Sequence, residues 1–394
     1  MRQLIASLAL MASTVLMVAG EAVPRVSILV ASPGVEVYQL EGHAGLRIVD
    51  VDGGDFVVDW GLFDFNSPGF LVRFVRGETD YSTGVRETSS FIAGYAVRNR
   101  GVIEIPLNLS AEQAEAVKNL VFENLKPENR VYRYNYVKDN CSTRPLRIVE
   151  RAIGDSILLS VPAEFAGKQA SFRDVMRWCH RNYPWYQFGI DLALGCGIDY
   201  PLLAREFAFA PVLLPDMLVG AETASGGEVI AGEPIVLWPE LNRAVAEPTP
   251  WYLTPMALSV VLLLGSVWIT VGDIRRRRVS RWFDCCLFTL YGLAGCVIAF
   301  LVFVSVHEAT SPNWLLAWLN PFCFIGAWGV WLKCCRKMVL CYHFVNFAVL
   351  MSLALAWQWL GQVGNVAFIP LIAADAMRSA SYVYINRCTV KKPA

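Results

Sequence analysis

The chain has 394 residues, of which 55% are hydrophobic and 17% charged, so it carries more apolar surface than an ordinary soluble protein. Its 34 basic residues balance its 34 acidic residues, and this neutral sum argues against nucleic acid as a partner. Of the 11 cysteines, only Cys141, Cys179 and Cys196 precede residue 250. They exclude a disulfide framework and allow at most one bridge, between Cys179 and Cys196. A membrane-embedded part is therefore expected.

The first twenty residues have the pattern of a secretory signal peptide. Arg2 precedes an apolar run at 4–18, and Val18-Ala19-Gly20 supplies small residues for cleavage. If this segment is not cleaved, it becomes an N-terminal anchor. Both alternatives carry the following domain out of the cytoplasm.

Residues 21–250 have the pattern of one globular domain, because no run in them is long enough to span a bilayer. Strands are expected at about 25–31, 46–50 and 56–60. The last two are joined by Asp52-Gly53-Gly54, a tight-turn sequence, which predicts a β-hairpin.

Two helices and one strand are expected in the second part of this domain. Ser110 and Gln113 form a capping box that opens a helix ending near Pro127. A helix from Cys141 to about Gly154 follows, with Asn140 or Asp139 as its cap. Between the two helices we expect a strand with three tyrosines on one face, Tyr132, Tyr134 and Tyr136.

After residue 250 the sequence becomes strongly apolar. Five stretches are each long enough to span a bilayer, at about 252–271, 284–306, 314–332, 339–360 and 363–384. The first and third connections and the tail are rich in Arg or Lys, whereas the second and fourth connections have neither. Because basic loops stay in the cytoplasm, this alternation predicts that residues 21–250 lie outside and the C-terminus inside.

Two local sequences carry candidate chemistry: Glu41-Gly42-His43-Ala44-Gly45-Leu46-Arg47 and Asp139-Asn140-Cys141-Ser142-Thr143-Arg144. The second places a cysteine at the first turn of a helix, where unpaired N–H groups and a partial positive charge stabilise a thiolate. Cys141 is therefore the candidate nucleophile. His43, at the start of a strand, is the candidate base, because an imidazole can pair with the thiolate and transfer protons.

Further residues are expected around this pair. Asp59, on the second hairpin strand, is the candidate for orienting His43. The backbone N–H groups of Cys141 and Ser142 are candidates for binding an oxyanion. Arg47 and Arg144 are cations near the pair that could hold a phosphate, although a role in surface solubility is the alternative for both.

Each of these residues also has a structural interpretation. A lone cysteine is more often a small buried hydrophobe, but Cys141 has polar residues on both sides. His180 is the rival candidate for the base. No His-x-x-x-His or Cys-x-x-Cys pair occurs in 21–250, so no metal or other cofactor is expected. Asp375 and Arg378, one turn apart in the last apolar stretch, could pair with each other or contact a lipid head group.

A strand histidine followed by Asn-Cys at a helix start resembles the circularly permuted NlpC-type papain-like fold, which includes the lecithin retinol acyltransferases. Nearly the whole chain is similar to the Lnb-type lipoprotein N-acyltransferases. This similarity rests on the multispan C-terminal half and on four motifs: Gly42-His43-Ala44-Gly45-Leu46-Arg47-Ile48, Trp60-Gly61-Leu62-Phe63-Asp64-Phe65, Tyr132-Arg133-Tyr134-Asn135 and Asp139-Asn140-Cys141-Ser142-Thr143-Arg144.

The resemblance implies an α+β, permuted papain-like domain at 21–250 in the periplasm and an all-α transmembrane domain of about five helices at 251–394. It places the protein in a bacterial inner membrane. It also implies acyl transfer from a phospholipid to the N-terminal amine of a diacylated lipoprotein, with His43 and Cys141 at the positions of the catalytic pair. Two rivals remain open: a membrane-bound cysteine hydrolase acting on peptide or lipid, and a non-enzymatic accessory protein or chaperone for exported proteins.

Overall fold

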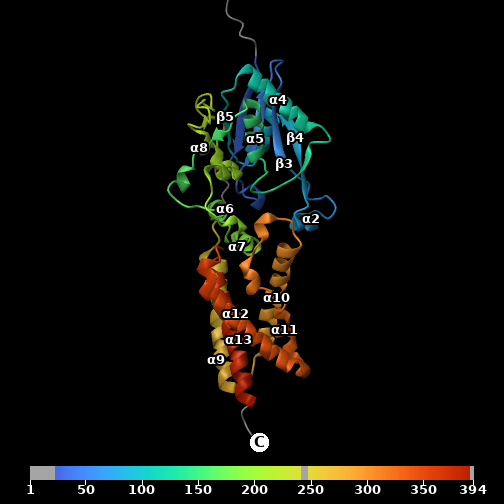
Figure 1. Ribbon diagram of the computed structural model, residues 1–394, viewed down its shortest axis with the longest axis vertical. Helices are drawn as coiled ribbons and strands as arrows, with labels where there is room; N and C mark the ends of the chain where they lie inside the picture. Colours follow the sequence, from blue (N-terminus) through green and yellow to red (C-terminus); the bar gives the residue numbers. More distant parts are fainter. Residues whose placement is uncertain (1–22, 241–246, 391–394) are drawn as a thin grey trace, which may run out of the picture.

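The computed structural model describes residues 23–240 and 247–390, which form an α/β domain stacked end to end on a helical domain (Figure 1). The signal peptide predicted at 1–20 lies outside the described residues. The predicted order, an α/β domain followed by a helical domain, is confirmed. The permuted papain-like arrangement stays a prediction.

The N-terminal domain is built on a seven-stranded antiparallel sheet in the order β6-β4-β3-β2-β1-β5-β9. Its strands are β1 (Arg25–Ala31), β2 (His43–Val49), β3 (Asp55–Leu62), β4 (Asp80–Glu87), β5 (Val102–Pro106), β6 (Val131–Arg133) and β9 (Ile235–Trp238). The predicted hairpin is confirmed as β2 and β3, with Gly45 opposite Asp59. Gly53 in the turn has φ +91°, a left-handed conformation that glycine adopts without strain.

Alternation along the strands gives the sheet two buried faces. Ile28, Leu46 and Trp60 lie on one face, which packs against α4 (Ala111–Leu125) and α5 (Thr143–Ile153). The opposite face packs Leu29 and Val57 against Phe91 of α3 (Thr88–Ala96). The predicted capping box is confirmed at the start of α4, where Ser110 Oγ accepts the Gln113 N–H.

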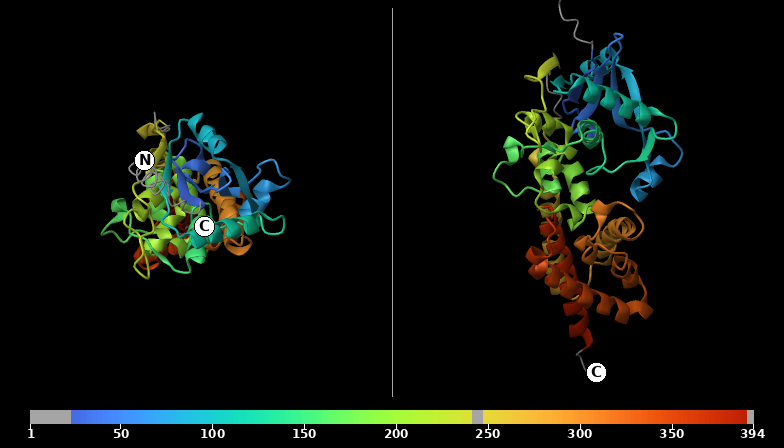
Figure 2. Two further views of the ribbon diagram at one scale, coloured as in Figure 1. Left: turned by 90° about the horizontal axis from the view of Figure 1, so that it is seen from above. Right: turned by 45° about the horizontal axis from the view of Figure 1, so that its top comes forward.

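A segment of short helices and loops follows α5. Its helices α6 (Phe172–Cys179) and α7 (Pro184–Ala193) lie between the sheet and the helical domain, whereas α8 (Leu214–Leu218) lies beside the sheet (Figure 1 and Figure 2, right). The segment also contains the small β7–β8 pair (Ile157–Leu158 and Glu222–Thr223). Phe207 and Phe209 anchor it in the main core. The bridge considered between Cys179 and Cys196 is not formed.

The helical domain has four long helices: α9 (Pro255–Arg276), α10 (Arg281–Phe303), α12 (Arg336–Ala356) and α13 (Phe368–Val390). In the described residues, three helical stretches are long and apolar enough to cross a membrane: Pro255–Arg276, Arg281–Phe303 and Lys333–Trp359. The stretch predicted at 314–332 is not one helix but short pieces that include α11 (Cys323–Trp328). Pro321 explains the break, since it has no N–H and the residue before it avoids the helical region.

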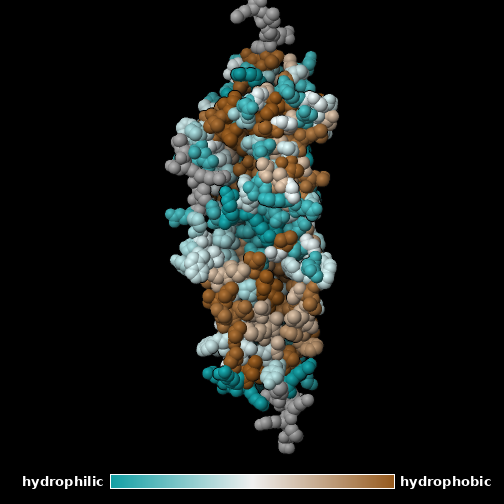
Figure 3. All heavy atoms as spheres, turned by 90° about the vertical axis from the view of Figure 1, so that its left-hand side faces the viewer, coloured by the Kyte–Doolittle hydropathy of each residue, from teal (hydrophilic) through white to brown (hydrophobic). Residues whose placement is uncertain are grey.

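On the face shown in Figure 3, the helical domain has a broad apolar band, with hydrophilic residues at its far end. Long helices that expose many hydrophobic side chains are typical of a lipid environment. Arg378 of α13 is buried between these helices and pairs with Asp273 at 2.7 Å and Asp284 at 2.6 Å. The alternative of an Arg378 pair with Asp375 is therefore wrong. Asp375 instead accepts a hydrogen bond from Asn346.

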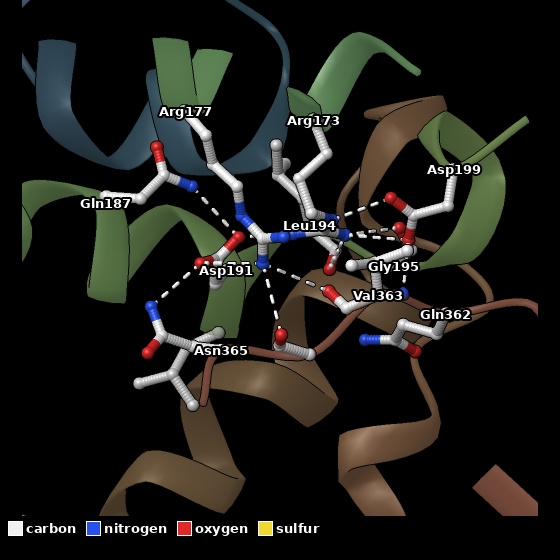
Figure 4. Close-up of polar contacts among 12 residues, drawn as sticks. Arg173, Arg177, Gln187, Asp191, Leu194, Gly195, Asp199, Gln362, Val363 and Asn365 are labelled. Carbon is white, nitrogen blue, oxygen red and sulfur yellow. Dashed lines mark hydrogen bonds and ion pairs between the residues drawn. The ribbon is translucent and has the colours of Figure 1, made fainter. Parts of the chain in front are cut away.

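A buried ion-pair network in the first domain is linked to the second by hydrogen bonds (Figure 4). Arg173 of α6 is fully buried and pairs with Asp191 at 3.0 Å and with Asp199 at 2.7 Å. The same two carboxylates accept hydrogen bonds from Asn365 Nδ2 and from the Val363 N–H, both in the α12–α13 connection. Because a buried carboxylate is strongly destabilising without partners, this network fixes the α/β domain on the helices.

Candidate active site

Cys141 lies directly before α5, and Asn140 fixes its position. The Asn140 Oδ1 accepts the N–H of Ser142 at 2.9 Å and of Thr143 at 3.0 Å, as an N-capping side chain does. Its Nδ2 donates to the carbonyls of Tyr136 and Phe209. Asn140 is 2% exposed, so its amide has no competing water. The helix starts later than the predicted Cys141, at Thr143 with Ser142 in the N-cap position, but the Asn140 amide still ties the turn that carries the cysteine to two separate segments.

His43 is the first residue of β2 and follows a turn that needs glycine. Gly42 has φ +87°, and a Cβ there would lie 2.7 Å from the Ala31 carbonyl oxygen. The turn brings the imidazole to the end of the sheet where β3 ends and α5 begins, and Cys141 lies close enough to it to raise its pKa. The structure therefore brings the two predicted residues together.

The third predicted residue, Asp59, lies beside this pair. Its Oδ2 is 3.7 Å from His43 Nε2, and it also forms an ion pair with Arg86 of β4. Asp59 is fully buried, and its Oδ1 has no hydrogen-bond partner within residues 23–240 and 247–390. Burial raises the pKa of Asp59, but His43 and Arg86 outweigh it and lower the pKa below its ordinary value.

The electrostatics of His43 favour the imidazolium. Burial lowers its pKa, but the acidic groups next to it, the Tyr95 hydroxyl, the Cys141 thiol and the Asp59 carboxyl, outweigh this and raise the pKa well above 6.5. The His43 side chain keeps 18% of its surface exposed, so it is not sealed in the core. A charged imidazole at neutral pH can pair with a thiolate and donate a proton to a leaving group.

Close approach around Cys141 depends on a second glycine. The β3–β4 register shifts between Asp59 and Leu62, and Gly61 within this bulge has φ +83°. A Cβ at Gly61 would lie 3.3 Å from the Tyr134 ring and 3.8 Å from the Cys141 Cβ. The bulge therefore lets an aromatic ring lie close to the cysteine.

One of the two expected oxyanion donors is not available. The Ser142 N–H already donates to Asn140 Oδ1. The expectation for Ser142 is therefore wrong, since a capping side chain uses this donor, and the Cys141 N–H remains the candidate.

The two arginines that could hold a phosphate are both engaged by carboxylates. Arg47 forms bidentate contacts with Asp55 and with Glu104, and it lies nearer the turn end of the hairpin, away from His43. It does not belong to the site. Arg144 is near Cys141, but it pairs with Asp139 in bidentate geometry and lies 3.3 Å above the Tyr132 ring. Its position is that of a structural cation.

The rival base His180 is not next to the cysteine. Its ring nitrogens contact Glu41 Oε1 at 2.6 Å and Gln187 Oε1 at 2.8 Å, and the imidazole is buried. Glu41, which stands two residues before His43, also accepts a hydrogen bond from the Tyr136 hydroxyl. His180 therefore helps to hold the turn that presents His43.

Sequence reasoning missed Arg86, Glu41 and Tyr95. Arg86 reaches Asp59 only because β4 pairs with β3, and the Tyr95 ring of α3 stacks on His43 at 6.2 Å. No local pattern marks either contact. Glu41 belongs to the motif around His43, so its nearness to the histidine in sequence was the one signal that could have identified it as part of the site.

Two family models match the chain. The Lnb N-terminal periplasmic domain matches residues 21–170, which include His43, Asp59 and Cys141, and the Lnb transmembrane domain, a model of five helices, matches residues 247–389. Searches of curated proteins and of solved structures find no match. With a periplasmic domain and a transmembrane domain in this order, the chain belongs to the Lnb family of membrane proteins.

Proposed function

We propose that this protein is a lipoprotein N-acyltransferase that carries an acyl chain on Cys141 as a thioester. The acyl donor is a membrane phospholipid, and the acceptor is the N-terminal amine of a diacylglyceryl-cysteine lipoprotein. Membership of the Lnb family supports a membrane enzyme that modifies lipoproteins. The observation that carries the proposal is the placement of His43, which has Asp59 beside it at 3.7 Å and lies close enough to Cys141 for the thiol to raise the pKa of the imidazole.

The position of the cysteine relative to the helical domain supports a lipid substrate. Lys138, three residues before Cys141, forms an ion pair with Glu308 in the connection that follows α10. That connection also accepts hydrogen bonds from the backbone N–H groups of Gly195 and Cys196. Phospholipid and lipoprotein are both held in a bilayer, so a thiol close to the end of a spanning helix can meet both.

The proposed cycle has two acyl transfers. In the first, the Cys141 sulfur attacks the ester carbonyl carbon, the C–S bond forms and the C–O bond breaks, and the imidazolium of His43 protonates the departing alkoxide to give a lysophospholipid. In the second, the lipoprotein amine attacks the thioester, the C–N bond forms and the C–S bond breaks. His43 takes the proton from the amine, which restores the thiolate and imidazolium pair. Asp59 keeps the imidazole oriented throughout.

The charge pattern supports one orientation in the bacterial inner membrane. Four consecutive arginines, Arg275 to Arg278, lie at the end of α9 that is far from the α/β domain, and Arg336 and Lys337 open α12. With basic residues in the cytoplasm, the α/β domain lies in the periplasm and the C-terminus in the cytoplasm.

Mass spectrometry of lipoprotein N-termini tests the proposal. Cells that depend on this protein for N-acylation should contain triacylated lipoproteins, and Cys141→Ser or His43→Ala should leave them diacylated with the variant still in the membrane. Free fatty acid released without N-acylation would support the rival hydrolase. Unchanged N-acylation with Cys141→Ser would overturn the proposal and leave the accessory role.

A further inference from the structure

The short helix α2 (Phe70–Arg76) exposes apolar side chains next to the membrane domain (Figure 1). Leu71 is 71% exposed and Val72 is 60% exposed, and Phe74 is also exposed. Only Phe70 of this helix is buried. A soluble domain gains nothing from such a cluster, since each of these side chains is more stable away from water.

The position of α2 relative to α10 is fixed by direct contacts. The Val306 N–H donates to the Arg76 carbonyl at 2.9 Å, and the His307 ring lies 2.8 Å from the Phe74 carbonyl oxygen. Val306 comes three residues after the end of α10 at Phe303. Because α10 is one of the helices able to cross a membrane, α2 lies at the level where the bilayer meets the periplasmic domain.

Exposed apolar side chains are present on both sides of this contact. Phe303, Val304 and Val306 are exposed at the end of α10, and Leu71 and Val72 are exposed on α2. Arg73 and Arg76 are exposed on the same helix. Apolar side chains next to basic ones are the pattern of a helix that lies in the interface of a membrane with anionic phosphates.

An unbroken series of aromatic rings connects α2 to the cysteine. We call it the aromatic strip, and its members are Phe63, Phe65, Phe70, Phe74, Tyr81 and Tyr134. Ring centroids are 4.2 Å apart for Tyr134 and Tyr81, and 5.2 Å apart for Tyr81 and Phe63. From there the strip continues through Phe70 to Phe74, with centroids 5.8 Å and 6.0 Å apart.

The end of the aromatic strip at Tyr134 lies beside the nucleophile. As described above, the Tyr134 ring and the Cys141 Cβ both lie close to the point where a Cβ of Gly61 would stand, at 3.3 Å and 3.8 Å. Phe65 and Tyr38, which pack on Phe63, are exposed, whereas Phe70, Tyr81 and Cys141 are buried. Packed aromatic rings therefore extend from the membrane level to Cys141 and are exposed at Phe65 and Phe74, and a flexible hydrocarbon chain that packs against them keeps apolar surroundings.

We propose that α2 inserts into the outer leaflet of the bilayer and that the aromatic strip guides the acyl chain of the donor phospholipid to Cys141. This inference rests on the proposed function and deepens it by naming the site that receives the donor. The phospholipid acyl chain is the occupant, because its ester carbonyl must reach the sulfur while the rest of the chain stays in apolar surroundings. The amine of the lipoprotein is a polar group and needs no such apolar path to reach the sulfur.

Insertion can be tested without acyl transfer. The full-length protein with Cys141→Ser is placed in phospholipid nanodiscs, and a fluorescent amino acid replaces Leu71 or, as the control, Val51. Val51 is also exposed, but it lies in the β2–β3 turn at the opposite end of the sheet. Phospholipid with brominated acyl chains should quench the probe at position 71 and not at 51. Equal, weak quenching at both positions would overturn the insertion of α2.

Guidance by the aromatic strip is tested with two further measurements. A benzophenone amino acid in place of Phe65 should crosslink to a phospholipid acyl chain, and the same group at Val51 should not. The double substitution Leu71→Glu with Val72→Glu should slow acylation of Cys141 from bilayer phospholipid by about tenfold or more, because two inserted apolar side chains are lost. Val51→Glu should leave the rate within about twofold.

The outcomes separate this inference from the proposed function. Normal acylation by the double variant, or no lipid crosslink at position 65, would overturn the guidance while the acyltransferase stands. Quenching and crosslinking as expected, in a wild-type protein that forms no acyl-Cys141, would overturn the acyltransferase and leave a lipid-binding surface.

Discussion

Asp59→Asn tests how the site charges its imidazole, because the substitution keeps the size of the side chain and removes its negative charge. Asp59 Oδ2 lies 3.7 Å from His43 Nε2, and two unit charges about 4 Å apart interact by about 4 kcal/mol at an effective dielectric constant of about 20. Arg86 contacts the same oxygen and offsets part of this interaction. We therefore expect the imidazolium to lose about 2 kcal/mol of stabilisation. This loss corresponds to a roughly 30-fold lower rate of Cys141 acylation.

The assay measures, by mass spectrometry, the initial rate of acyl-Cys141 formation in the full-length protein with phospholipid. The rate is measured as a function of pH. The carboxylate of Asp59 helps to raise the pKa of His43. Its loss lowers that pKa, so the fall in rate on the alkaline side should move to lower pH. Asp52→Asn in the exposed hairpin turn is the matched control and should change neither the rate nor the profile. An Asp59→Asn protein with the wild-type rate and pH profile would refute the orienting role.

Three further outcomes are expected. Asn140→Ala removes five side-chain hydrogen bonds around the nucleophile. The free energy of unfolding should fall by about 3 kcal/mol or more, and thermal melts in detergent that match the wild type would contradict this. Asp191→Asn removes a buried negative charge that pairs with Arg173 and Arg177. The free energy of unfolding should fall by about 3–5 kcal/mol, and faster proteolysis at the domain junction is the readout. The pKa of His43 is raised on folding, so its contribution to stability is present below its unfolded value and is lost as the pH rises through the folded value. Denaturant curves for wild type and His43→Gln should therefore converge as the pH rises, and a gap that widens would contradict the assignment.

Local signals in the sequence predicted the parts of the site that depend on neighbouring residues. The turn at Gly53 and the capping box at Ser110 were readable because each acts within a few residues of the chain. His43 and Cys141 were paired because an imidazole can hold a helix-start thiolate, and because both stand in motifs that resemble one family. These features explain why the candidate pair could be named from sequence.

Contacts between distant segments could not be predicted in the same way. Arg86 meets Asp59 through the β3–β4 register, and His180 meets Glu41 across 139 residues. Arg144 resembled a free cation in the sequence, yet Asp139 and the Tyr132 ring hold it. A local pattern gives the type of a charged residue but not its partner, which depends on the packing of the whole domain.

In the membrane domain, hydropathy predicted a helical domain correctly but missed a broken helix and the buried ion pairs. Composition predicts the helical stretches well because each must satisfy its backbone within itself. It failed at 314–332, where apolar residues continue through Pro321 although the helix does not. It also could not show that Arg378 is neutralised by Asp273 and Asp284 from α9 and α10.

The most direct test of the account is the chemical state of the sulfur at position 141 after the purified, full-length protein is incubated with phospholipid alone. Intact-peptide mass spectrometry should find one acyl chain on Cys141, removable by neutral hydroxylamine and absent from His43→Ala. It should disappear when a diacylated lipopeptide with a free amine is added, and a triacylated lipopeptide should form. A Cys141 that stays unmodified while N-acylation proceeds would contradict the account.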